Sequence, residues 1–133
     1  MRDYARRQTA LLLRRLAAAL NRAARAGDAE SIHDVRVAMR RLSRCLRVFA
    51  PFYPNRSGKK LRRQLASLME TAGAVRDCDI AIDLLAQAGV PRRESVVARL
   101  EAERRRAGRD LQLQIRRWKN RDSLRQWRSR LEV

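Results

Sequence analysis

Apolar residues recur every three or four positions along most of the 133-residue chain, which is the period of an amphipathic α-helix. No segment shows the strict alternation of apolar and polar residues that indicates a half-buried strand. The pattern predicts helices over residues 3–26, 29–50, 58–72, 76–88 and 92–119, followed by a short helix that contains Leu124, Trp127 and Leu131.

Glycine, proline and small polar residues stand between the periodic stretches, where helices are expected to end. Gly27 is placed to stop the first helix, and Asp28 or Ser31 is placed to cap the second. The stretch F-Y-P-N-R-S-G, residues 52–58, is typical of a loop. Gly73 predicts a kink or a break between the third and fourth helices.

Five to six helices with short connections predict an all-α antiparallel bundle, a single domain over residues 1–133. Hydrophobic residues make up 45% of the chain, which is enough for a core and argues against a disordered polycation. Cys45 and Cys78 are too few for a disulfide framework or a zinc site, so we expect reduced thiols in a cytoplasmic protein. No apolar run approaches the roughly 20 residues of a membrane-spanning helix, and no signal-peptide core follows the N-terminus.

Charge changes this picture, because 32 Lys and Arg residues face only 14 Asp and Glu residues, a net charge of +18. A compact chain with this charge repels itself, so we expect a polyanionic partner: nucleic acid, polyphosphate or an anionic membrane surface. The charge is also uneven. Residues 31–70 hold ten Lys and Arg against two acids, whereas residues 71–91 hold one Arg against three Asp. The two regions are expected to be neighbours that partly neutralise each other.

The helix at 29–50 holds five arginines and the single histidine of the chain. On a helical wheel its apolar stripe spans an arc of about 100°, made of Ile32, Val35, Met39, Leu42, Leu46 and Phe49. A second arc, about 80° wide and centred about 120° from the first, contains His33, Arg36, Arg40, Arg44 and Arg47. Successive members of this basic row are neighbours on the helix surface, where like charges weaken the helix.

Two interpretations of the row remain open from the residues alone. It is either a solvated helix face, partly neutralised by Asp77, Asp79 and Asp83, or a ladder of guanidinium groups along which a chain of phosphates could lie. His33 is likewise either a capping or core-edge histidine or the first contact of that ladder. As a catalytic base or a metal ligand it has no second histidine to work with.

The stretch H-D-V-R-V-A-M-R-R-L-S-R-C-L-R-V-F, residues 33–49, resembles the signature helix of the CHAD domain, the conserved histidine α-helical domain. Family members share the pattern H-x-x-R-V-x-x-R-R-L-R, although Ser43 stands here where a further arginine is common. The stretch L-R-R-Q-L-A-S-L-M-E-T-A-G-A-V-R-D-C-D-I, residues 61–80, is similar to the family's leucine-rich helix that leads into G-x-x-R-D-x-D-V. The two motifs have the family's order and spacing, and together the resemblance covers about residues 29–88.

The resemblance implies a helical bundle whose basic groove binds inorganic polyphosphate, with no catalytic residue, metal or cofactor. It assigns phosphate contacts to His33, Arg36, Arg40, Arg41 and Arg44. Position on the helices adds Arg47, then Lys59, Lys60 and Arg63 as an opposite wall, and Arg76 as a further contact. Asp77 and Asp79 are expected mainly to orient arginines of the second helix.

CHAD domains usually contain two related halves, and only the first is evident in this chain. The resemblance therefore implies half of a double bundle, with a homodimer completing the groove. It also implies association with polyphosphate granules in the cytoplasm.

Three other functions remain as alternatives. Nucleic-acid binding suits the charge, but aromatic residues make up only 5% and no base-stacking platform is evident. If polyphosphate is the main ligand, nucleic acid is expected to be a weaker polyanionic partner. Phosphate-transfer chemistry normally needs Mg²⁺ held by carboxylates among the basic groups, and the acids here cluster away from the row, at 77–83. A membrane-surface helix over residues 2–25 is the weakest alternative.

Overall fold

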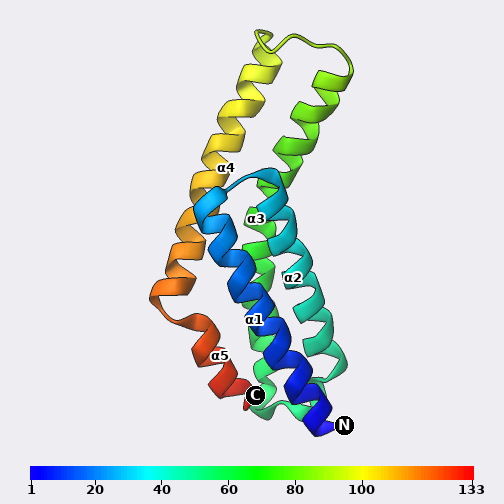
Figure 1. The fold of residues 1–133 in the computed structure, drawn as a ribbon, viewed down its shortest axis with the longest axis vertical. Helices are drawn as coiled ribbons and strands as arrows, with labels where there is room; N and C mark the ends of the chain where they lie inside the picture. Colours follow the sequence, from blue (N-terminus) through cyan, green and yellow to red (C-terminus); the bar gives the residue numbers. More distant parts are fainter.

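The computed structural model describes all 133 residues and confirms the all-α bundle (Figure 1). Two short 3₁₀ turns, Ala50–Phe52 and Pro54–Arg56, form most of the predicted loop after the second helix. The five α-helices are α1 (Arg2–Ala26), α2 (Ala29–Val48), α3 (Ser57–Gln87), α4 (Ser95–Asn120) and α5 (Ser123–Leu131).

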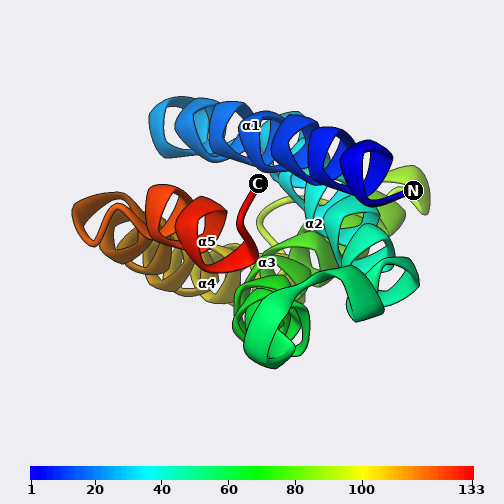
Figure 2. The ribbon, with the colours of Figure 1, turned by 90° about the horizontal axis from the view of Figure 1, so that it is seen from below.

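The four long helices run antiparallel in chain order around one core. Seen along the long axis, α1, α2, α3 and α4 follow one another around the bundle, and α5 lies beside α4 under α1 (Figure 2). Both chain ends lie at the same end of the molecule (Figure 1). In this order the seam between α2 and α3 and the seam between α4 and α1 lie on opposite sides of the bundle.

The core is built from the apolar stripes that the sequence pattern predicts. In α2, Ile32, Met39 and Leu46 are at most 1% exposed, and the last member of the stripe, Phe49, is half-buried. In α3 the leucines of the predicted face, Leu61, Leu65, Leu68, are buried with Ala72. Burial of these side chains is the main favourable term that holds the helices together.

The boundary between α1 and α2 follows the predicted signals. Gly27 has a positive φ of 61°, and its N–H donates to the carbonyl oxygen of Ala23 across 2.9 Å, which ends α1. Asp28 then caps α2, because its Oδ1 accepts a hydrogen bond from the N–H of Ser31 at 3.0 Å. Hydrogen bonding from Ser31 also lowers the pKa of the Asp28 carboxyl.

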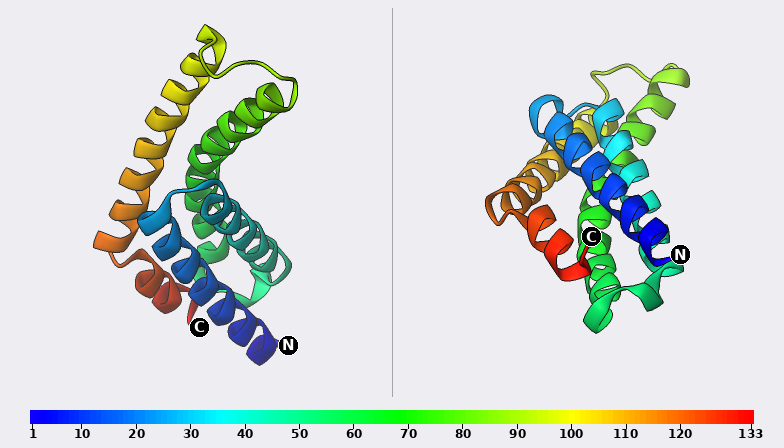
Figure 3. Two further views of the ribbon diagram at one scale, coloured as in Figure 1. Left: turned by 45° about the horizontal axis from the view of Figure 1, so that its top comes forward. Right: turned by 60° about the horizontal axis from the view of Figure 1, so that its bottom comes forward.

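The predicted break at Gly73 is wrong, because α3 is one continuous helix from Ser57 to Gln87, which bends along its length (Figure 3). A glycine inside a helix costs about 1 kcal/mol relative to alanine. Ala72 and Val75, which flank Gly73, are fully buried in the core, and their burial holds the helix together across that weak point.

The α3–α4 hairpin extends beyond the corner where α1 meets α2 (Figures 1 and 3). Its far end is less covered than the rest of the bundle, and Ile80, Leu84 and Val96 there are 41%, 58% and 45% exposed.

Both cysteines are free, Cys45 buried and Cys78 half-buried. None of the five helices has the length and apolar character needed to span a membrane.

Candidate functional site

The basic row predicted on α2 lies on one flank of that helix, and we call it the α2 row. Four of its members are exposed, whereas Arg36 is half-buried, with its Nε atom buried and without a hydrogen-bond partner. A buried donor without a partner costs about 1–3 kcal/mol, which an anion bound beside Arg36 would recover. The α2 row consists of His33, Arg36, Arg40, Arg44 and Arg47.

The α2 row faces the α3 side of the bundle. The opposite flank of α2 contacts α1, where Asp34, Ala38 and Arg41 line a shallow hollow of about 300 Å³ with residues of α1. The core stripe lies between the two flanks, so the row borders the seam between α2 and α3. This seam is the candidate site.

On α3, Gly58 marks the side that faces α2, because a Cβ added there would lie 3.5 Å from the carbonyl oxygen of Leu46. At about 100° per residue, Arg76 has the same direction as Gly58, and Arg62 differs from it by only about 40°. Both arginines are half-buried, and the Nε atom of Arg62 is buried without a partner, as in Arg36. Arg62 and Arg76 therefore form the α3 wall of the candidate site.

Sequence reasoning did not single out Arg62. A signal was present, because Arg62 follows Gly58 by one helical turn and so shares the side that packs on α2. The sequence pattern alone does not say which flank of a leucine stripe meets α2 and which meets α4.

The structure does not bring all ten predicted site residues together. Arg41 lies on the α1 side of α2, in the hollow that Arg15 and Arg22 also line. On α3, Lys59 and Arg63 are turned about 100° and 140° from Gly58, and Lys60 points away from α2. The six predicted residues that share the seam are His33, Arg36, Arg40, Arg44, Arg47 and Arg76.

The expectation that Asp77 and Asp79 orient the arginines of α2 is wrong, and neither they nor Asp83 form an ion pair with α2. Four ion pairs are present in the structure, and none involves a residue of α2. Asp79 pairs instead with Arg104 of α4, whose Nε lies 3.1 Å from its Oδ1. No carboxylate of the chain therefore forms an ion pair with the α2 row.

Comparison with known protein families decides the relationship. The sequence model of the CHAD domain family matches residues 7–132, which is nearly the whole chain. The chain belongs to the CHAD domain family. The match extends from α1 to α5, well beyond the two motifs at 29–88 that carry the resemblance in the sequence.

CHAD domains are in general non-catalytic domains associated with the binding of polyphosphate. A search of curated proteins and a search of solved structures found no match to this chain. The family is thus associated with one class of ligand, and the geometry above gives the candidate residues of this chain.

Proposed function

We propose that this chain binds inorganic polyphosphate along the seam between α2 and α3, without catalysis. The observation that carries the proposal is the α2 row: five basic side chains, three or four residues apart, with no ion pair to any carboxylate of the chain. Successive contacts rise by about one helical turn, roughly 5 Å. A linear chain of phosphates is the ligand that such a row suits.

Each member of the site has a chemical role in this proposal. The arginines donate paired N–H groups to phosphate oxygens, in a geometry that lysine does not reproduce. Arg36 and Arg62 offer buried Nε donors that the protein itself leaves unpaired. His33, exposed in the first turns of α2, supplies the end contact.

Gly73 contributes free space to the same seam. A Cβ added at Gly73 would meet no atom within 4 Å. Gly73 lies one turn before Arg76 on α3, about 60° from it around the helix. A phosphate can thus approach the α3 backbone beside the guanidinium of Arg76.

Isothermal titration with long-chain polyphosphate at about physiological salt tests the proposal. The variant Arg36→Ala/Arg40→Ala should bind at least about a hundredfold more weakly, because it loses two charge-assisted hydrogen bonds that contribute about 1.5–3 kcal/mol each. The matched control is Arg125→Ala/Arg128→Ala, which removes two exposed arginines from α5. Equal losses in both variants would indicate diffuse charge attraction and would contradict the proposal.

Nucleic acid is the competing ligand. Polyphosphate should displace single-stranded RNA at equal phosphate concentration, because the seam offers charge and linearity but no exposed aromatic platform for bases. Affinity should fall steeply with added salt as counterions are released. If RNA displaces polyphosphate instead, nucleic-acid binding becomes the better assignment.

We further propose that two copies of the chain associate, and that the protein localises to polyphosphate granules. The support for association is the exposed apolar surface of the α3–α4 hairpin, formed by Ile80, Leu84 and Val96. Light scattering that gives a monomer mass with and without polyphosphate would contradict the dimer.

A further inference from the structure

A second basic row lies on α4. Like the α2 row, it consists of basic side chains at helical spacing beside a buried apolar stripe. Its members follow one another at helical spacing and lie about 110° around the helix from the buried stripe of Leu111 and Ile115. All of them are exposed, and none takes part in an ion pair. We call Arg105, Arg109, Arg116 and Lys119 the α4 row.

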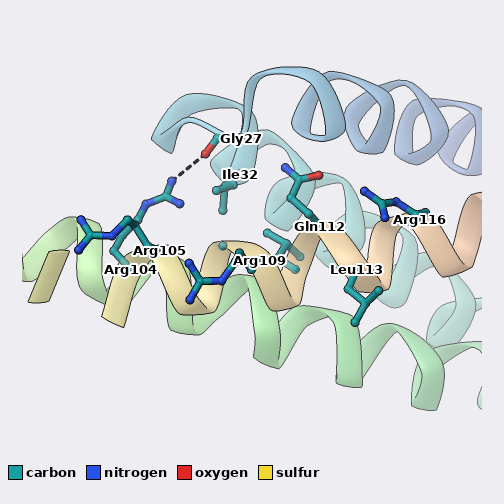
Figure 4. A pocket seen from close by; sticks show the side chains of 10 residues that line it. Gly27, Ile32, Arg104, Arg105, Arg109, Gln112, Leu113 and Arg116 are labelled. Atoms are coloured by element: carbon teal, nitrogen blue, oxygen red, sulfur yellow. Dashed lines mark hydrogen bonds between the residues drawn. The ribbon is translucent and has the colours of Figure 1, made fainter. Parts of the chain in front are cut away.

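The α4 row lines a groove against the end of α1. A hollow of about 580 Å³ is formed by α4 together with Gly27 and Ile32 from the α1–α2 corner (Figure 4). A second hollow of about 240 Å³ shares Gln112 and Arg116 with the first and continues to Lys119. The groove thus follows α4 for about 15 residues, or roughly 22 Å, and no carboxylate lines either hollow.

Other residues of α4 build this groove and leave the row free. Arg104 donates from Nη2 to the carbonyl oxygen of Gly27 at 2.7 Å (Figure 4). Gln112 donates from Nε2 to the carbonyl oxygen of Ala23 at 2.7 Å. Both bonds hold the end of α1 at a fixed position against α4. Gly108 has no side chain, and a Cβ there would lie 2.8 Å from Nη1 of Arg104, so the floor of the hollow stays open.

The α4 row and the α2 row lie on opposite sides of the bundle. The hydrogen bond of Gln112 to Ala23 shows that the flank of the α4 row faces α1. The other flank of α4 faces α3, because Gln114 donates to Thr71 across 2.7 Å. The α4–α1 seam and the α2–α3 seam are therefore separated by the core (Figure 2), and a strand bound in one does not block the other.

We propose that the α4–α1 groove is a second site for a linear phosphate polymer, so that one molecule bridges two polyphosphate strands. The class of ligand rests on the proposed function, whereas the second site rests on the groove and its unpaired arginines. A protein with two such faces crosslinks polyphosphate, and bridging is what gathers separate strands into one particle.

A bridging assay tests this proposal. Polyphosphate is attached to a surface, protein is bound and washed, and fluorescent polyphosphate is added. The wild-type protein should capture the fluorescent strand. The variant Arg105→Ala/Arg109→Ala should still bind the surface but capture at least tenfold less fluorescence, and Arg125→Ala/Arg128→Ala should capture as the wild type does. Melting temperatures of all variants confirm that each is folded.

The outcomes separate the two proposals. If the α4 variant captures as much as the wild type, bridging comes from association of two copies, and the second site is overturned. If the wild type binds the surface but captures nothing, the second site is overturned while the proposed function stands. If only the α4 variant loses surface binding and Arg36→Ala/Arg40→Ala does not, the α2 assignment fails. Capture of fluorescent RNA but not polyphosphate would overturn the ligand class of the α4 groove.

Discussion

The guanidinium of Arg104 on α4 pairs with the carboxylate of Asp79 on α3, with 3.1 Å between Nε and Oδ1. The same guanidinium reaches the carbonyl oxygen of Gly27, so one side chain joins α3, α4 and the corner between α1 and α2. Both partners are mostly buried, at 22% and 19% side-chain exposure, and Oδ2 of Asp79 has no hydrogen-bond partner. Arg104 is thus the main group that balances a largely buried negative charge.

Replacing Arg104 with alanine should lower the free energy of unfolding by about 2–4 kcal/mol, because Asp79 is left without its counter-charge. Asp79→Ala should be less harmful, since Arg104 keeps its bond to Gly27. Urea denaturation of both single variants and of the double variant measures the coupling. The double variant should lose less stability than the sum of the two single losses. Additive losses would show that the pair is not coupled.

The hydroxyl of Tyr53 is buried between Thr9 of α1 and Cys45 of α2. Tyr53→Phe should cost about 1 kcal/mol, because Thr9 keeps its bond to the carbonyl oxygen of Ala5 at 2.7 Å. Thr9→Val should cost more, because the Tyr53 hydroxyl would then have only the sulfur of Cys45, 4.0 Å away. Urea denaturation at pH 7 measures both losses. Equal losses would contradict this asymmetry.

The same tyrosine should make the protein sensitive to alkali. Burial raises the pKa of Tyr53 above its ordinary value, so the folded state resists its ionisation. The stabilising effect is complete below the unfolded pKa of about 10 and is lost as pH rises toward the folded pKa. The stability gap between the wild type and Tyr53→Phe should therefore narrow between pH 9 and about 11, as followed by urea midpoints. A gap that is constant across this range would contradict the assignment.

The fold could be predicted from the sequence because its core rests on local periodicity. The apolar stripes of α2 and α3 recur at helical spacing, and burial of one side of each helix leaves few ways to assemble an antiparallel bundle. The predicted break at Gly73 failed because a glycine is a local signal, whereas the burial of Ala72 and Val75 is a tertiary one. Tertiary packing outweighs a loss of helix propensity of about 1 kcal/mol, which is the cost of one glycine inside a helix.

The candidate site could be predicted only in part, for a related reason. The α2 row is visible on one helix and needs no knowledge of its neighbours. Its opposite wall depends on how α3 is rotated against α2, and the wheel of α3 alone does not distinguish Arg62 from Arg63. The pairing of Asp79 with Arg104 joins residues 25 positions apart, so the spacing of charges along the chain does not reveal it.

Gly73→Ala should change the free energy of unfolding and the affinity for polyphosphate in opposite ways. The helix does not require glycine here, since φ is not positive and a Cβ would meet no atom within 4 Å. Alanine should therefore raise the free energy of unfolding by about 0.5–1 kcal/mol. It should also weaken polyphosphate binding if phosphate approaches the α3 backbone beside Arg76. Higher stability with unchanged affinity would show that the open space is not part of the site.

Arg62 and Arg63 provide the sharpest test of the binding seam, because they are adjacent in sequence, carry the same charge and point in different directions. Arg62 is half-buried on the α2 side of α3, whereas Arg63 is exposed and turned about 100° from it. Arg62→Ala should weaken polyphosphate binding about as much as Arg40→Ala, by tenfold or more, since one charge-assisted hydrogen bond is lost in each. Arg63→Ala should change affinity less than threefold, through net charge alone. Titration of the three variants at one salt concentration makes the comparison, and a larger effect of Arg63 than of Arg62 would move the opposite wall of the site to the outer face of α3.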